Sequence, residues 1–100
     1  MTEELEHAVA RRSSGQGASE LFDALEQNRE AVEKLLRGVS RFVAYTLMRT
    51  AEGGLSVPVC RDKAGYDASV QATGNWVREN VKTTVSPPQV LVGNVTLVLM

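Results

Sequence analysis

The sequence predicts an α+β domain of βαββαβ order, and three observations lead to that prediction. The first is a long helical pattern between residues 19 and 38, and the second is a weaker one that begins near residue 62. The third is a set of short apolar segments that precede, separate and follow these helices. Two βαβ halves of this kind form a four-stranded antiparallel sheet with both helices on one face.

The first strand is predicted over residues 6–12, where apolar and polar residues alternate weakly. The helix that follows has apolar residues at three- and four-residue spacing. Its stripe consists of Leu21, Phe22, Leu25, Val32, Leu35, Leu36 and Val39. Ser19 is expected to cap its first turn and Gly38 to close its last.

A β-hairpin is predicted next, from residues 42–48 and 55–60 around the glycine turn at 51–54. Pro58 conflicts with this prediction, because a proline in a central strand cannot donate to the ladder. We therefore expect a bulge or a changed register near Pro58.

The second helix is expected to begin after Asp62 as its cap and to end at Ser86, although Gly74 costs it about 1 kcal/mol relative to alanine. Its stripe consists of Tyr66, Val70, Thr73, Trp76, Val77 and Val81. The last strand is predicted over residues 90–99, interrupted at Gly93 and Asn94.

Two of the predicted strands are apolar on both faces. Residues 42–48 and 95–99 are nearly continuously apolar, whereas a sheet with one face in water should show alternation. The two helices can cover one face only. A second copy of the chain on the other face is the simplest cover, so the sequence predicts a homodimer formed through the sheet.

Composition limits the domain count and the class of partner. A chain of 100 residues fits a single domain, here 1–100. It has 11 basic and 12 acidic residues, which argues against nucleic acid as a partner. No segment approaches the roughly 20 apolar residues that span a bilayer, so no membrane association is expected.

The cellular setting and cofactors follow from the same inventory. Cys60 is the single cysteine and His7 the single histidine, which are too few ligands for a zinc site. No metal or other cofactor is predicted. The lone cysteine and the lack of a signal peptide in residues 1–12 indicate the cytoplasm.

The segments Phe42-Val43-Ala44-Tyr45, Asp62-Lys63-Ala64-Gly65 and 75–80, together with the element order, resemble the antibiotic biosynthesis monooxygenase-like group. The resemblance covers almost the whole chain. It implies a ferredoxin-like fold, a dimeric α+β barrel, and a pocket between sheet and helices in each subunit. Enzymes of this group include cofactor-independent oxygenases of phenols or quinols and relatives that degrade haem, and other members have no known activity. The fold alone therefore does not specify a function.

Trp76 and Asn75 attract attention because oxygenases of this group use tryptophan and asparagine near the substrate. Adjacent helix residues diverge by about 100°, so these two side chains cannot both point into one pocket. The helical stripe favours a core position for Trp76, with ligand binding as the alternative.

Four further residue types could take part in catalysis or ligand binding. His7 could act as a base, and antiparallel pairing could bring it near Cys60, although a lone cysteine in a strand is usually a small buried hydrophobe. Tyr45 could hydrogen-bond a phenolic ligand from the sheet. An anionic group could be held by Arg11, Arg49 or Arg61, each of which is equally explained as a surface or interface residue.

These observations predict a homodimeric domain that binds a small aromatic or similar metabolite in a pocket between sheet and helices. One alternative is a cofactor-independent monooxygenase acting on a phenol or quinol, whose candidate catalytic residues are His7, Tyr45 and Asn75. Another alternative is a structural dimerisation module whose pocket is filled by side chains.

Overall fold

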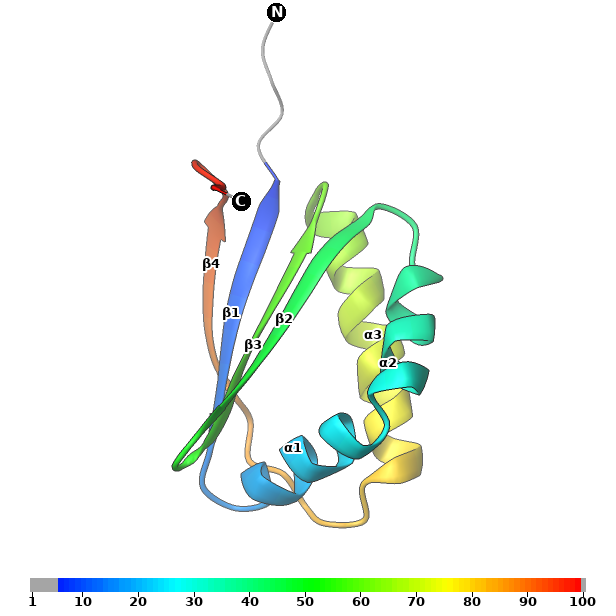
Figure 1. Cartoon of the computed structure of the whole chain (residues 1–100), viewed down its shortest axis with the longest axis vertical. Coiled ribbons are helices and arrows are strands. Elements are labelled where there is room, and N and C mark those ends of the chain that lie inside the picture. The colour runs from blue at the N-terminus through cyan, green and yellow to red at the C-terminus, as the bar shows by residue number, and fades with distance from the viewer. Residues whose placement is uncertain (1–5, 100) are drawn as a thin grey trace, which may run out of the picture.

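The computed structural model describes residues 6–99, which form one antiparallel sheet with three helices on one side (Figure 1). The strands are β1 (His7–Ser14), β2 (Phe42–Thr50), β3 (Gly53–Cys60) and β4 (Gln89–Asn94). Their spatial order is β2-β3-β1-β4. This is the predicted α+β fold with a four-stranded antiparallel sheet. The expected lack of a signal peptide concerns residues 1–12, of which 1–5 lie outside the described residues.

The predicted helix over 19–38 consists of two helices, α1 (Ala18–Gln27) and α2 (Arg29–Arg37). Asn28 separates them, and its backbone N–H and its side-chain amide both donate to the carbonyl of Ala24, at 3.1 and 2.8 Å. Such local bonding competes with continuation of a helix, so one apolar stripe runs over a bent pair.

The start of α1 also differs from the prediction. Gly17, not Ser19, is the cap residue, and it has a φ of 79°. A Cβ atom at this position would overlap the carbonyl of Thr84. The turn therefore requires glycine both for its positive φ and for the close approach of the Thr84 backbone. Serine at position 19 therefore already lies inside the first helical turn.

The hairpin of β2 and β3 forms as predicted, and Pro58 pairs with Tyr45 of β2. The register with β2 shifts between Phe42 and Ala44, which is a bulge at Val43. On the β1 side, recorded pairing stops after Ala8 with Val59 and resumes at Arg11 with Ser56 in the same register. Pro58 therefore faces an interruption of the ladder with β1, while the ladder with β2 includes it and is irregular only at the Val43 bulge.

The second predicted helix is α3 (Lys63–Asn80), and the Asp62 carboxylate caps it by accepting a hydrogen bond from the Gly65 backbone N–H at 2.9 Å. It ends before the predicted Ser86, and residues 81–88 form an irregular connection to β4. No helix within residues 6–99 combines the length and apolar character needed to cross a bilayer.

The last strand is shorter than predicted, because β4 ends at Asn94 and residues 95–99 are not in a strand. The reason lies in the pairing: Asn94 is opposite His7, the first residue of β1, so the chain beyond it runs past the end of β1. The Val95 N–H still donates to the Glu6 carbonyl at 2.8 Å.

Burial divides the sheet into two unlike faces. The helix-covered face contains the core, in which the side chains of Val9, Phe22, Leu36 and Cys60 are almost inaccessible. The opposite face, which we call the open face, carries apolar side chains that no part of residues 6–99 covers. Met48 is 50% exposed and Leu91 is 64% exposed, and the segment beyond β4 reaches 84% at Leu99.

Candidate functional site

A cavity of about 250 Å³ lies between the sheet and the helices, and we call it the inner cavity. Side chains of β1, β2 and β3 form its floor, α1 and α3 form its walls, and the connection before β4 closes one side. The floor residues are Arg11, Ser13, Tyr45, Ser56 and Pro58, and the others include Leu21, Leu25, Val70, Thr73, Gly74, Val77 and residues 85–88. Most of this lining is apolar, with a few polar groups on the floor.

Tyr45 brings an ionisable hydroxyl to this floor. Burial raises the pKa of Tyr45 above its ordinary value of 10.0, while the Ser56 side chain and the positive charge of Arg11 oppose that rise. The phenol therefore keeps its proton at neutral pH. It can donate a hydrogen bond to a ligand oxygen, but it is a poor base.

Arg11 is the one charged residue among the described residues that line the inner cavity. It shares the covered face of β1 with Val9 and Ser13, which are 0% and 7% exposed. Its Nη1 donates a hydrogen bond to the hydroxyl of Tyr66 at 2.7 Å. This bond from α3 fixes the direction of the guanidinium.

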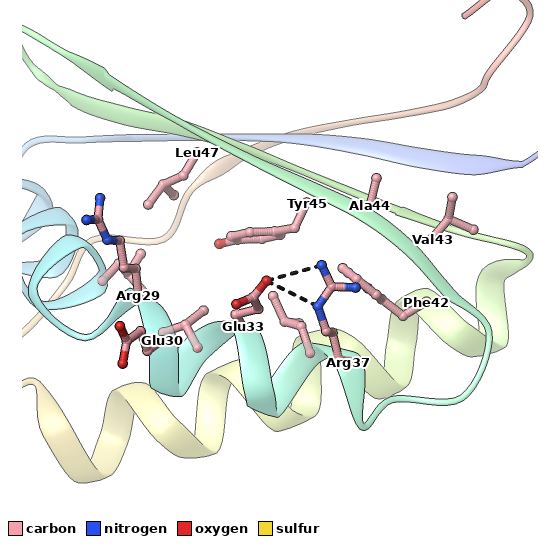
Figure 2. Close-up of a pocket in the computed structure, with 12 residues that line it drawn as sticks. Arg29, Glu30, Glu33, Arg37, Phe42, Val43, Ala44, Tyr45 and Leu47 are labelled. Atoms are coloured by element: carbon pink, nitrogen blue, oxygen red, sulfur yellow. Dashed lines mark hydrogen bonds and ion pairs between the residues drawn. The ribbon is translucent and has the colours of Figure 1, made fainter. Parts of the chain in front are cut away.

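A second and larger hollow of about 540 Å³ lies between β2 and α2, and we call it the edge groove (Figure 2). It lies beside β2, which is an edge strand of the sheet. Charged α2 residues line it, including an ion pair of Arg37 with Glu33 at 3.1 Å. The edge groove is larger, but the inner cavity is somewhat more enclosed and has the more apolar lining, so it is the better ligand site.

Tyr45 and Leu25 line both hollows. Figure 2 shows the Tyr45 ring projecting from β2 into the space beside α2. The tyrosine side chain is therefore part of the wall that separates the inner cavity from the edge groove.

His7 and Cys60 lie directly opposite each other on β1 and β3, as antiparallel pairing predicts. Their side chains form no hydrogen bond with each other in the described part of the chain. The ring of His7 packs at 5.6 Å from that of Tyr66, and neither His7 nor Cys60 lines the inner cavity. Desolvation raises the pKa of the fully buried Cys60 thiol, which disfavours the reactive thiolate.

Asn75 and Trp76 also lie away from both hollows. Asn75 is exposed on α3 and its Oδ1 accepts a hydrogen bond from Arg78. Trp76 is half-buried and packs against the core cluster of Leu25, Val32 and Leu36, in agreement with its place on the helical stripe.

The other two arginines considered from the sequence lie elsewhere. Arg49 forms ion pairs with Asp23 at 2.6 Å and Glu26 at 3.1 Å on the surface, and Arg61 is exposed. Within residues 6–99, no three histidine, cysteine or acidic side chains gather as a metal site would require.

Sequence reasoning missed several residues of the inner cavity. Ser13 and Ser56 come from different strands, and neither belongs to a recognisable motif. Gly74 carried a usable signal, because a glycine within a helical stripe often marks a close approach or an opening. A Cβ atom at Gly74 would meet nothing within 4 Å, which identifies an opening.

No family model and no curated protein matches the chain. Solved structures do match. A protein of unknown function from Nitrosomonas europaea aligns with 99% of this chain and 97% of its own, at 15% identity and a TM-score of 0.69. A protein from Bordetella bronchiseptica that carries the name of the antibiotic biosynthesis monooxygenases aligns with 95% of this chain and 100% of its own, at 14% identity and a TM-score of 0.67.

A monooxygenase from the ActVA-Orf6 gene of Streptomyces coelicolor, solved in complex with nanaomycin D, aligns with 96% of this chain and 91% of its own, at 16% identity and a TM-score of 0.58. Identities this low establish shared architecture and no more. The chain has the ferredoxin-like α+β fold of the antibiotic biosynthesis monooxygenase-like proteins.

Proposed function

We propose that residues 1–100 form a single domain that assembles as a homodimer and binds a small aromatic metabolite in the inner cavity. The observation that carries this proposal is the cavity itself. It combines a polar floor on a rigid sheet with apolar walls from α1 and α3, which is the usual composition of a small-molecule site.

Cavity size limits the ligand class. Small-molecule sites commonly occupy roughly 300–1,000 Å³, so the inner cavity, at about 250 Å³, lies just below that range. It suits a ligand of about one or two fused rings more than a larger polycycle. Pro58 and Val77 offer apolar contact surfaces for such rings.

The open face supports the homodimer. Leu91 and Leu97 are 64% and 74% exposed, and Met48 is 50% exposed, on or beside a face that the helices do not cover. Several large apolar side chains left exposed on one side of a folded protein indicate an interaction site. A second copy offers the same apolar surface, so a symmetric interface buries both faces at once. The single buried thiol of Cys60 fits a reducing compartment, so we place the dimer in the cytoplasm.

A native mass spectrum of the purified protein tests assembly and ligand together. We expect a dimer, either carrying retained mass or acquiring it from a panel of one- and two-ring aromatics. Calorimetric titration should confirm saturable binding. A monomer would contradict the homodimer, and a dimer that binds none of the panel would favour a structural dimerisation module.

A matched pair of variants on α3 locates the binding. Thr73→Leu adds volume to the lining of the inner cavity and should weaken the ligand found by titration. Ala68→Leu adds the same side chain to the exposed side of α3 and should leave affinity unchanged. Equal affinity in both variants would place the ligand elsewhere.

A cofactor-independent monooxygenase acting on a phenol or quinol is the alternative, and it is favoured by the fold shared with the Streptomyces monooxygenase. Such a reaction needs a group that removes a substrate proton in the cavity. Of His7, Tyr45 and Asn75, the tyrosine is the one that lines it, and its raised pKa suits donation of a hydrogen bond to a substrate oxygen better than removal of a proton, which counts against this alternative. Oxygen consumption with one- and two-ring hydroquinones, lost in Tyr45→Phe, would support this alternative.

A further inference from the structure

We infer that the ligand of the inner cavity is an aromatic carboxylate, with its carboxylate held by Arg11. This inference rests on the proposed small-molecule site and names the ligand class. The lining of the cavity combines one cation, Arg11, and a few hydroxyl groups with mostly apolar side chains.

The first argument is the charge balance around Arg11. Arg12, Arg37, Arg41 and Arg49 each have a carboxylate partner within 3.2 Å. The arginines without such a partner within residues 6–99, apart from Arg11, are all exposed: Arg29, Arg61 and Arg78. Within residues 6–99, no carboxylate lies within ion-pair distance of Arg11. A half-buried guanidinium without a counter-charge is a costly arrangement, and an anionic ligand would compensate it.

The second argument is the availability of donors. A guanidinium carries five N–H donors, and the hydrogen bond to Tyr66 uses one on Nη1. That bond holds the group in place, while Arg11 lines the inner cavity. A positioned guanidinium with free donors matches the two oxygens of a carboxylate in a bidentate pair.

The third argument is the position of the neighbouring hydroxyls. Ser56 is the cross-strand partner of Arg11, and Ser13 lies two residues along the same face of β1. Both serines line the inner cavity together with Arg11, so their hydroxyl groups are available to the same ligand. The apolar Pro58 and Val77 of the lining offer surfaces on which its rings would pack.

This arrangement selects among anions. A phosphate dianion would bury two charges against a single cation, because no second cationic residue lines the described cavity. A phenolate presents one oxygen and cannot use the forked donors in parallel. A carboxylate matches both the single positive charge of Arg11 and the two parallel N–H donors of its guanidinium.

Calorimetric titration at neutral pH with 2-naphthoate, 2-naphthalenemethanol and 2-naphthyl phosphate tests this inference. We expect naphthoate to bind at least about ten-fold more tightly than the neutral alcohol, because a charge-assisted bidentate pair is stronger than a neutral hydrogen bond. A phosphate ester that binds more tightly than naphthoate would overturn the assignment.

Arg11→Gln should remove the preference for naphthoate while leaving the affinity for the alcohol within about three-fold. Arg11→Lys keeps the charge without the fork and should retain only part of the preference. Arg12→Gln is the matched control, since Arg12 is the next residue of β1 but is exposed and paired with Glu52, and it should change nothing.

Nitrogen-15 NMR on the unmodified protein covers the case in which the Arg11 variants do not fold. Naphthoate should shift the side-chain Nε–H resonance of Arg11 and not that of Arg12. An unchanged Arg11 resonance at saturation would overturn the inference.

The outcomes separate the two proposals. If naphthoate and the alcohol bind equally, the proposed aromatic site is supported and carboxylate binding by Arg11 is contradicted. If no ring compound binds, the proposed site itself fails, and the carboxylate assignment fails with it.

Discussion

Tyr45 is a buried phenol on the floor of the inner cavity, and its environment has a consequence for stability at high pH. Burial raises the pKa of Tyr45 in the folded state above its ordinary 10.0. The folded state therefore favours the neutral phenol. The stability that this provides is fully present below the unfolded pKa, and it is lost as pH rises through the raised folded value.

We predict that this loss disappears in Tyr45→Phe. The difference in Tm between wild type and variant should be constant from about pH 7 to about pH 9 and should then change in favour of the variant above about pH 10. Thermal unfolding at a series of pH values measures it, and subtraction removes the shared titrations of other groups. A difference that stays constant at high pH would contradict the buried-phenol assignment.

Trp76 is the residue at which the core and ligand-binding interpretations differ most. It packs against Leu25, Val32 and Leu36 and does not line the inner cavity. We predict that Trp76→Phe lowers the free energy of unfolding by about 1 kcal/mol through lost packing, with ligand affinity unchanged. Denaturant unfolding and titration of the same sample check this. Lost affinity at unchanged stability would reverse the assignment.

At the scale of elements, local chemistry was predictable where a side chain acts on its own segment. The Asp62 cap and the hairpin follow from residues near one another in sequence. The break at Asn28 could not be predicted, because the apolar stripe continues through it and an asparagine on a helix surface is not a strong stop signal. The end of β4 could not be predicted either, because it depends on where the paired strand β1 begins.

Gly74 gives a prediction at this scale, because it weakens α3 where it lines the inner cavity. Gly74→Ala should raise the free energy of unfolding by about 0.5–1 kcal/mol, since the added Cβ has nothing within 4 Å. The same methyl group occupies cavity space and should weaken ligand binding.

Ala68→Gly is the control for this prediction. It introduces the opposite change on the exposed side of α3 and should lower stability by about 1 kcal/mol without affecting affinity. Denaturant unfolding and titration of both variants give the comparison. Stabilisation by Gly74→Ala with full affinity would mean that the ligand does not approach α3.

For the whole molecule, the apolar pattern of the strands was a better guide to the uncovered sheet face than the candidate site residues were to the composition of the inner cavity. The apolar segment 42–48 anticipated an uncovered sheet face, on which Met48 is exposed. The segment 95–99, used for the same prediction, is exposed but lies outside the sheet. The inner cavity combines Arg11, Tyr45 and Ser56 from three strands. No spacing in the sequence records that combination, because it arises only when the sheet order is set.

We predict that Leu97→Lys yields a monomer with a lower Tm, since it places a charge in the proposed interface. Ala31→Lys, on the exposed surface of α2, should remain a dimer. Light scattering at several protein concentrations measures the assembly. The wild-type Tm should also rise with protein concentration. A dimeric Leu97→Lys variant would argue against an interface at this segment.

The break at Asn28 divides the helical segment into α1 and α2, and these two helices line different hollows. Residues of α1 contact the inner cavity, whereas residues of α2 line only the edge groove. A cooperative unit of a protein can open locally while its neighbours stay folded. Leu25 and Tyr45 line both hollows, so a movement of α2 about this break would change the edge groove directly and would reach the inner cavity only through these two shared side chains.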